Sequence, residues 1–223
     1  MVTTLYLIRH CEAEGNIQEI FQGKTDGDIT AKGEQQLDRL AERCRDIPFD
    51  VIYSSPLKRA LKTAQAANRF HGVEIITDPA FAEIDGGEME GHRWKELSAL
   101  FPSTYPAWEK DFPNFKTEKG ESMQQLYTRI SQGVMRVVSE HKGKTVLITS
   151  HGCALRNLCC FLRGLPLSQI DSCPWVDNTA ISCYSFDESL RPTELFINDC
   201  THITSDPSLA PHQMWWRDQK LTK

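Results

Sequence analysis

The chain has 223 residues, 40% of them hydrophobic, with a formal net charge of −5. The length fits a single α/β domain over residues 1–223, and the acidic balance excludes nucleic acid and anionic membranes as main partners. No apolar run reaches the roughly 18 residues that cross a bilayer, and the N-terminus lacks a signal-peptide pattern, so we expect no membrane contact and a cytoplasmic protein.

The N-terminal half alternates apolar strands with amphipathic helices. Residues 4–9 predict the first strand, because a short continuous apolar run is typical of a buried parallel strand. Residues 31–46 predict a helix, since apolar side chains recur there at helical spacing. The other predictions for this half are a strand over 49–53, a helix capped by Ser55 with Pro56 in its first position, a strand over 74–77 and an acidic loop over 78–91.

The C-terminal half begins with an aromatic segment. Residues 92–100 predict a short helix, while 101–118 contain five large aromatic residues and three prolines. We expect an irregular aromatic cap there rather than a core element. The remaining predictions are a long helix capped by Ser122 and Gln125, a strand over 145–149, a helix opening near His151, a hairpin over 179–186 and 193–199, and a loosely packed tail from 202 whose Trp215 and Trp216 contact the domain or a partner subunit.

This order of elements predicts a three-layer α/β/α fold. A mainly parallel central sheet carries helices on both faces, with a small aromatic cap insertion around 92–118.

Two predicted strands end in histidines. Arg9 and His10 end the first strand, and His151 follows the strand over 145–149. Ligands in open α/β sheets bind beyond the carboxyl ends of the strands, so these side chains should converge with Arg59, in the first turn of its helix. Helix N-termini and arginines suit a phosphate dianion, and nearby cations keep a histidine neutral. A neutral imidazole is a nucleophile, so the pattern favours phosphoryl transfer to histidine.

The motifs of the chain resemble those of the histidine phosphatase superfamily (phosphoglycerate mutase-like proteins). The stretch over residues 7–16 reads Leu-Ile-Arg-His-x-Glu-x-x-x-Asn. Further matches follow in the family order, at residues 53–64, 83–91, 120–122 and 150–152. The chain departs from the family pattern at Cys11, where glycine is usual, and at Ala13, where threonine is frequent.

The resemblance implies roles for individual residues. His10 would be the nucleophile that becomes phosphohistidine, and Glu83 the general acid and then the base, although the neighbouring Asp85, Glu88 and Glu90 are alternatives. The resemblance implies neither a metal nor a cofactor, because cationic side chains hold the phosphate. The implied phosphate- and substrate-binding residues are Arg9, Asn16, Gln22, Gly23, Arg59, His151 and Gly152.

The expected partner is a small-molecule phosphomonoester, which the enzyme hydrolyses. The cap lacks the basic segment of the family's mutases and is rich in aromatics, which favours hydrolysis of a substrate with an apolar or planar leaving group. We expect this group to contact Trp94, Tyr105, Trp108 and Phe112. A cofactor-dependent phosphoglycerate mutase and a weakly catalytic phospho-ligand binding protein are the alternatives, and the oligomeric state, monomer or homodimer, stays open.

Eight cysteines without a C-x-x-C pair or a secretion signal predict reduced thiols. Cys11 and Cys153 adjoin the two histidines in sequence. We expect them to be packing residues; the alternatives are a thiolate that makes the activity sensitive to oxidation and, less favoured because of poor ligand spacing, a zinc site with His10 and His151.

Overall fold

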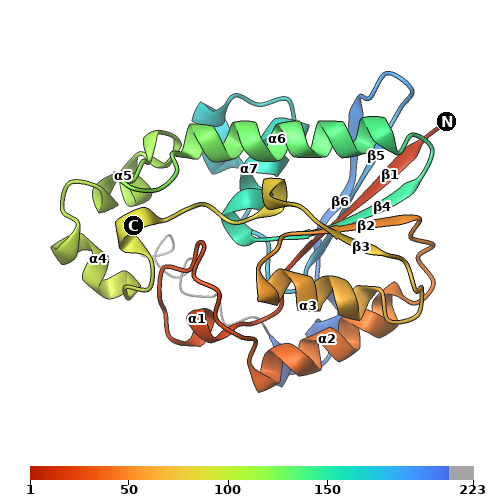
Figure 1. Cartoon of the computed structure of the whole chain (residues 1–223), viewed down its shortest axis with the longest axis horizontal. Helices are drawn as coiled ribbons and strands as arrows, with labels where there is room; N and C mark the ends of the chain where they lie inside the picture. The colour runs from red at the N-terminus through yellow and green to blue at the C-terminus, as the bar shows by residue number, and fades with distance from the viewer. Residues whose placement is uncertain (211–223) are drawn as a thin grey trace.

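A six-stranded sheet forms the centre of the computed structural model, which describes residues 1–210 (Figure 1). Its strand order is β3-β2-β4-β1-β5-β6. The first four strands in this order are parallel, and β5 runs antiparallel to β1 and β6. The strands are β1 (Thr3–Arg9), β2 (Val51–Ser54), β3 (Ile75–Thr77), β4 (Thr145–Ser150), β5 (Ile181–Phe186) and β6 (Pro192–Asp199). The mainly parallel sheet and the late hairpin are therefore confirmed.

Two long helices cover each face of the sheet (Figure 1). Successive residues of β1 point to opposite faces, so Leu5 and Leu7 join one apolar cluster while Tyr6 and Ile8 pack in the other. The first cluster lies under α6 (Met123–Glu140) and α7 (Gly152–Leu162), and the second under α2 (Ala31–Cys44) and α3 (Lys58–Ala67). This arrangement is the predicted three-layer fold.

The start of α6 is set by a local capping box, whereas the start of α3 differs from the sequence prediction. Ser122 and Gln125 close the predicted capping box of α6. The prediction that Ser55 caps α3 is wrong, because α3 begins at Lys58 after Leu57. The Ser55 hydroxyl instead lies against His151, at the end of the neighbouring strand β4.

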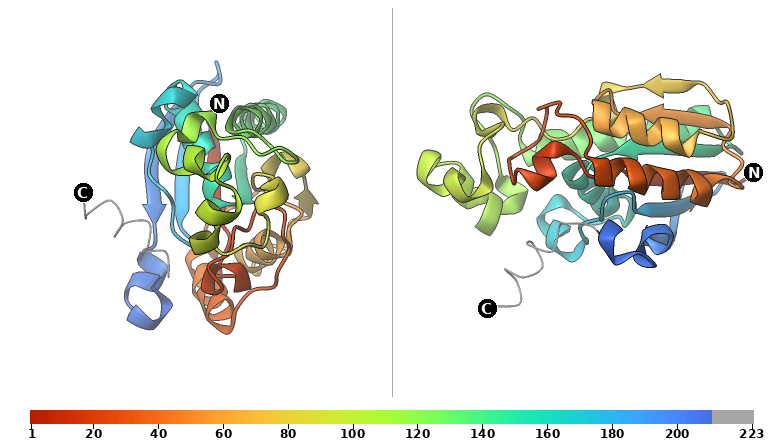
Figure 2. Two further views of the ribbon diagram at one scale, coloured as in Figure 1. Left: turned by 90° about the vertical axis from the view of Figure 1, so that its left-hand side faces the viewer. Right: turned by 90° about the horizontal axis from the view of Figure 1, so that it is seen from below.

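The cap projects beyond one end of the sheet (Figures 1 and 2). It contains α4 (Trp94–Leu100) and α5 (Tyr105–Lys110), and the short helix α1 (Glu14–Ile17) lies beside it. The segment 101–118 was expected to be irregular and outside the core, and both expectations need correction: it contains the helix α5, and its aromatic side chains are part of the core. Tyr105, Trp108, Phe112 and Phe115 are all buried and pack with Phe21 in the larger apolar cluster.

The described part of the tail is anchored to the domain. Residues Thr201–Thr204 form α8, and Leu209 is buried, with its carbonyl accepting a hydrogen bond from the Gln36 side chain. Trp215 and Trp216 lie outside the described residues. Within 1–210, none of the helices combines the length and the apolar character needed to cross a lipid bilayer.

Candidate active site

The candidate site lies at the carboxyl ends of three adjacent parallel strands. His10 follows β1, His151 follows β4, and Ser55 follows β2. Arg9 and Ser150 are paired in the register of β1 and β4, so the two histidines that follow them are neighbours. Their ring centroids lie 5.2 Å apart. The sheet thus brings together the two imidazoles that the sequence places at two strand ends.

His10 is buried in a defined tautomer. Its Nδ1 lies 2.6 Å from the backbone carbonyl oxygen of Cys11, which can only accept, so Nδ1 carries the proton. Nε2 therefore keeps its lone pair. Burial, followed by the charges of Arg59 and Arg9, holds the pKa of His10 well below its usual range, so the ring is neutral at pH 7. A neutral imidazole with a free lone pair is the form that attacks phosphorus.

His151 has the opposite proton arrangement. Its Nε2 lies 2.7 Å from the hydroxyl of Ser55, which already accepts a hydrogen bond from the Leu57 amide. We assign the hydroxyl proton to the bond with His151 Nε2, which places the imidazole proton on Nδ1. Burial and the charge of Arg59 also lower the pKa of His151 well below its usual value. The ring is then a neutral N–H donor beside His10.

The two arginines of the site are buried, and only one lines the pocket. Arg9 lines it and donates from Nη1 to the Val176 carbonyl at 2.7 Å. Arg59 is not among the lining residues and donates to the carbonyls of Thr25 and Gly23, at 2.9 and 2.8 Å. Burial lowers the pKa of each to about 10. Both guanidinium groups therefore stay charged at neutral pH, and Arg59 also supports the loop 22–25.

Glu83 lines the pocket and is buried, with a carboxylate that three backbone amides hold in place. Oε1 accepts from Ile84 and Ala154, each at 2.9 Å, and Oε2 accepts from Cys153 at 3.0 Å. Burial raises the pKa of Glu83 above its ordinary value. Because Oε1 has both lone pairs engaged and Oε2 only one, the remaining lone pair of Oε2 is the natural place for a proton.

The alternative carboxylates point elsewhere. Asp85 forms an ion pair with Lys24 at 2.6 Å, and Glu88 accepts hydrogen bonds from the amides of Glu118 and Lys119. Glu90 holds the loop over residues 22–25. Of the four acidic residues that the sequence offers as the acid, Glu83 is the one that lines the pocket.

The expectation that helix N-termini offer open amides to a phosphate needs correction. At α7, the amides of Cys153 and Ala154 donate to Glu83. At α3, the amide of Lys58 donates to Asp26. These amides already have anionic partners, so side chains must provide much of the binding of a phosphate.

The residues of the loop after β1 divide into two groups. Asn16 and Gln22 line the pocket, as does Gly15. Gly23, predicted as a phosphate-binding residue, does not; its amide donates to Glu90, and a Cβ there would overlap the Ile84 carbonyl. Gly23 is therefore a packing residue of the loop.

Three buried N–H groups at the site have no hydrogen-bond partner among the described residues. They are His151 Nδ1, Gln22 Nε2 and Arg59 Nε. Buried donors without a partner cost free energy, and active sites are a recurring exception because a ligand completes them. His151 lies beside His10 and Gln22 lines the same pocket, so the N–H groups of these two residues suit the oxygens of a phosphoryl group.

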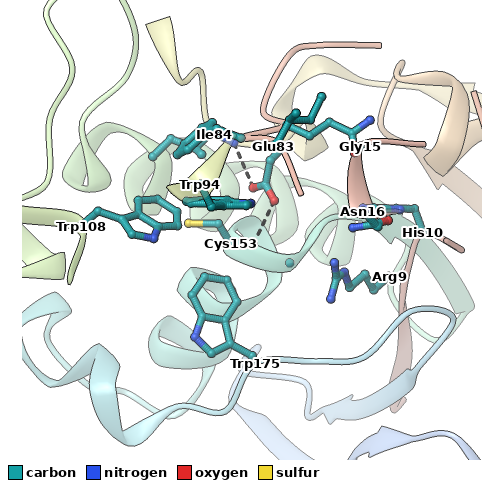
Figure 3. A pocket seen from close by; sticks show the side chains of 14 residues that line it. Arg9, His10, Gly15, Asn16, Glu83, Ile84, Trp94, Trp108, Cys153 and Trp175 are labelled. Atoms are coloured by element: carbon teal, nitrogen blue, oxygen red, sulfur yellow. Dashed lines mark hydrogen bonds between the residues drawn. The ribbon is translucent and has the colours of Figure 1, made fainter. Parts of the chain in front are cut away.

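Away from Arg9 and His10, the pocket becomes aromatic (Figure 3). Trp94 and Trp108 line it as expected, whereas Tyr105 and Phe112 do not. Trp175 also lines the pocket, although nothing in the sequence marks it: it comes from the segment after α7, where apolar residues show no regular spacing. The empty space of the pocket, including the solvent at its open mouth, is about 600 Å³.

Neither thiol near the histidines has a lowered pKa. Cys11 is fully buried against α2 and α3, outside the left-handed backbone region, and burial raises its pKa to about 12. Cys153 lines the pocket, and burial followed by the charge of Glu83 raises its pKa well above the ordinary value. These raised pKa values favour the expected packing role of both cysteines over a reactive thiolate. Within residues 1–210, no three histidine, cysteine or acidic side chains gather in a way that could hold a metal ion.

Comparison with known proteins gives consistent matches. A sequence profile of the histidine phosphatase superfamily (branch 1) matches residues 5–199. Phosphoserine phosphatase 1 of Hydrogenobacter thermophilus is 32% identical over 199 residues, which cover 89% of this chain and 93% of that protein. Phosphoglycerate mutase-like protein 4 of Arabidopsis thaliana is 32% identical over 202 residues, covering 89% and 86%. The structure of Bacillus stearothermophilus YhfR matches with a TM-score of 0.85 and 30% identity, over 90% of this chain and 99% of that one.

Proposed function

The chain belongs to the histidine phosphatase superfamily (branch 1), and on that basis we propose that it is a phosphatase that hydrolyses small phosphomonoesters through a phosphohistidine on His10. The observation that carries the proposal is the lone pair on His10 Nε2, which the Nδ1 hydrogen bond to Cys11 fixes, among buried donors that have no partner. Glu83, with a raised pKa, supplies the proton.

The first step transfers the phosphoryl group to the enzyme. His10 Nε2 attacks phosphorus, an N–P bond forms, and the bond from phosphorus to the leaving oxygen breaks. Glu83 gives its proton to that oxygen and becomes a carboxylate, so the product leaves as a neutral alcohol or phenol. Arg9 and His151 stabilise the charge on the phosphoryl oxygens during the transfer, and the buried positive charge of Arg59 adds to the potential of the site.

The second step returns the enzyme to its starting state. Glu83, now anionic, takes a proton from a water molecule as the water oxygen attacks phosphorus. The N–P bond breaks, inorganic phosphate leaves, and His10 regains its lone pair while Glu83 regains its proton. The two steps together consume one water and one phosphomonoester.

The first test is turnover of p-nitrophenyl phosphate in EDTA, with His10→Ala beside the unchanged protein. We expect phenolate release that falls by about 10⁴-fold or more in the variant, because the nucleophile is lost. His71→Ala is the matched control, since His71 contacts the Cys44 carbonyl away from the pocket. An unchanged protein that releases no phenolate contradicts the proposal and favours the mutase or the binding protein.

A second readout tests the intermediate. Quenching with alkali, in which phosphohistidine survives, followed by intact-mass measurement, should show one added phosphoryl group on the unchanged protein and on His71→Ala. The addition should be missing from His10→Ala. A turnover that persists in His10→Ala would overturn the proposed mechanism.

A further inference from the structure

The pocket has two chemically different ends (Figure 3). The phosphate end is formed by Arg9, His10 and Asn16. The aromatic end is formed by Trp94, Trp108 and Trp175. Glu83 lies between the two ends, so a leaving group whose oxygen reaches Glu83 extends toward the tryptophans, among which the Cys153 thiol is seen.

The three tryptophans form a continuous wall although they come from separate segments. The ring centroids of Trp94 and Trp108 are 5.5 Å apart with planes tilted by 36°. Those of Trp108 and Trp175 are 6.4 Å apart with a tilt of 40°. Phe21 continues the wall, 4.9 Å from Trp94. Such a wall gives this end of the pocket an aromatic lining against which a planar ligand can pack.

The aromatic end offers no partner for a charged leaving group. Among the described residues that line the pocket, the ionisable ones are Arg9, His10, Glu83 and Cys153. Of these, Cys153 is seen among the tryptophans, and its thiol carries no charge that could pair with a charged leaving group. The ammonium and carboxylate groups of phosphoserine would lose water there without gaining an ion pair, which is costly. The wall therefore disfavours phosphoserine, the substrate for which the Hydrogenobacter relative is named.

A buried arginine holds Trp175 in this wall. Arg156 of α7 is 4% exposed, and its guanidinium carbon lies 4.7 Å from the Trp175 ring centroid and 4.9 Å from that of Phe112. Its Nε donates to the Cys173 carbonyl at 3.0 Å, and its Nη2 donates to Asp171 at 3.0 Å. One side chain thus joins the cap, through Phe112, to the segment that carries Trp175.

We propose that the substrates are phosphomonoesters of uncharged, planar aromatic alcohols, whose ring stacks on Trp94, Trp108 and Trp175, and that Arg156 is the positioning residue for this wall. The proposal rests on the proposed function. It adds the class of leaving group, and it assigns Arg156 to substrate binding rather than to the chemical step.

The first experiment compares kcat/KM for 1-naphthyl phosphate and for phosphoserine in the unchanged protein and in Trp175→Leu. Aryl phosphates react faster for intrinsic reasons, so the informative quantity is the change that the variant causes for each substrate. We expect kcat/KM for 1-naphthyl phosphate to fall about tenfold, mostly through KM, and that for phosphoserine to stay nearly unchanged. Phe70→Ala is the control, because Phe70 is 43% exposed and stacks under Arg45 on the surface.

The outcomes separate this proposal from the proposed function. The aromatic assignment is overturned if Trp175→Leu lowers kcat/KM equally for the two substrates. It is also overturned if phosphoserine is the better substrate and its kcat/KM depends on Trp175. In both cases the proposal that the protein is a phosphatase stands. If the unchanged protein hydrolyses neither substrate in a His10-dependent way, the proposed function itself fails. A selective loss for 1-naphthyl phosphate supports the proposal.

The second experiment tests Arg156. In Arg156→Met we expect KM for 1-naphthyl phosphate to rise about fivefold while kcat changes little, because the wall is displaced and the reacting groups are not. Arg156→Lys keeps the positive charge, so it should restore part of the affinity for 1-naphthyl phosphate. It is also the milder variant, to be used if Arg156→Met does not fold. Arg163→Met is the control, because Arg163 lies at the C-terminal end of α7 and is paired with Glu194. A fall in kcat with unchanged KM in both Arg156 variants would overturn the positioning role.

Discussion

The hydroxyl of Ser55 lies 2.7 Å from Nε2 of His151, across the ends of strands β2 and β4. This contact decides which nitrogen of His151 carries the proton, and therefore which atom can donate to a phosphoryl oxygen. It also explains why Ser55 does not cap α3: the hydroxyl serves the histidine, and the helix begins at Lys58.

Replacement of Ser55 tests this proton arrangement. In Ser55→Ala the tautomer of His151 is no longer fixed, so we expect kcat to fall about tenfold, in line with the loss of one buried hydrogen bond. Ser54→Ala is the matched control, because the Ser54 hydroxyl donates to the Ser55 carbonyl and accepts from Thr149, away from His151. Steady-state kinetics on both variants measures kcat, and thermal melting compares their stability. Equal losses of kcat in the two variants would contradict the assigned role.

Glu83→Gln should lower kcat by about 10²- to 10⁴-fold, since an amide cannot give a proton to the leaving oxygen. Glu88→Gln is the control, because Glu88 contacts the amides of Glu118 and Lys119 outside the pocket. The pH profile adds a second readout. Burial raises the pKa of Glu83, so kcat/KM should decline on the alkaline side once Glu83 loses its proton, and this limb should be missing from Glu83→Gln. A variant that keeps full activity would assign the acid elsewhere.

The stability of the protein should fall in acid partly because of His202. Burial lowers the pKa of His202 to about 4, and its Nε2 contacts the Thr179 hydroxyl at 3.1 Å. The unfolded chain takes up a proton near the ordinary pKa of 6.5 and the folded protein does not, so free energy of unfolding is lost as pH falls from about 6.5 toward 4. In His202→Gln we expect a slope shallower by about 1.4 kcal/mol per pH unit in this window.

Urea unfolding at a series of pH values measures this slope for both proteins. Carboxylates titrate in the unfolded state of each protein alike, so their contribution cancels in the comparison. Parallel curves for His202→Gln and the unchanged protein would show that His202 titrates in the folded state as it does in the unfolded chain.

The activity should resist thiol oxidation. Burial raises the pKa of Cys11 to about 12 and that of Cys153 well above the ordinary value, and the thiolate is the form that reacts with peroxide. We expect hydrogen peroxide or iodoacetamide at pH 7.5 to leave kcat/KM unchanged, with both cysteines unmodified in a peptide map. Inactivation that follows modification of Cys153 would contradict this reading of the site.

Gly23→Ala should destabilise the loop after β1. An added Cβ would overlap the Ile84 carbonyl and the Glu90 carboxylate, which is the acceptor for the amides of residues 23–25. We expect a loss of about 2 kcal/mol in the free energy of unfolding, together with a rise in KM because Gln22 adjoins the change. Gly27→Ala is the matched control, since the nearest atoms to its Cβ would be 3.4 Å away. Equal stability of the two variants would rule out the steric explanation.

The sequence predicted the parts of the fold that depend on local pattern. The apolar run of β1 and the capping box at Ser122 are local signals, and the structure has both. The aromatic segment 101–118 was misjudged because it has no period, while its burial depends on packing with Phe21, far away in the chain.

For the site, the sequence places His10 and His151 together because both follow adjacent strands. It could not place Trp175, whose position depends on the distant contact with Arg156. The sequence also could not show that Gly23 lies outside the lining of the pocket. That position depends on the hydrogen bond between the Gly23 amide and Glu90, which is remote in sequence. Residues fixed by neighbouring secondary structure were predictable, and residues fixed by side chains remote in sequence were not.

The three amides that hold Glu83 have a consequence for repeated turnover. A buried carboxylic acid that gives up its proton usually becomes an isolated anion in a medium of low polarity. Here two of the amides, those of Cys153 and Ala154, belong to the first turn of α7, where the partial positive charge of a helix is concentrated. The helix therefore acts as a fixed counter-charge that is ready before ionisation, so the proton can leave and return without any movement of the surrounding chain.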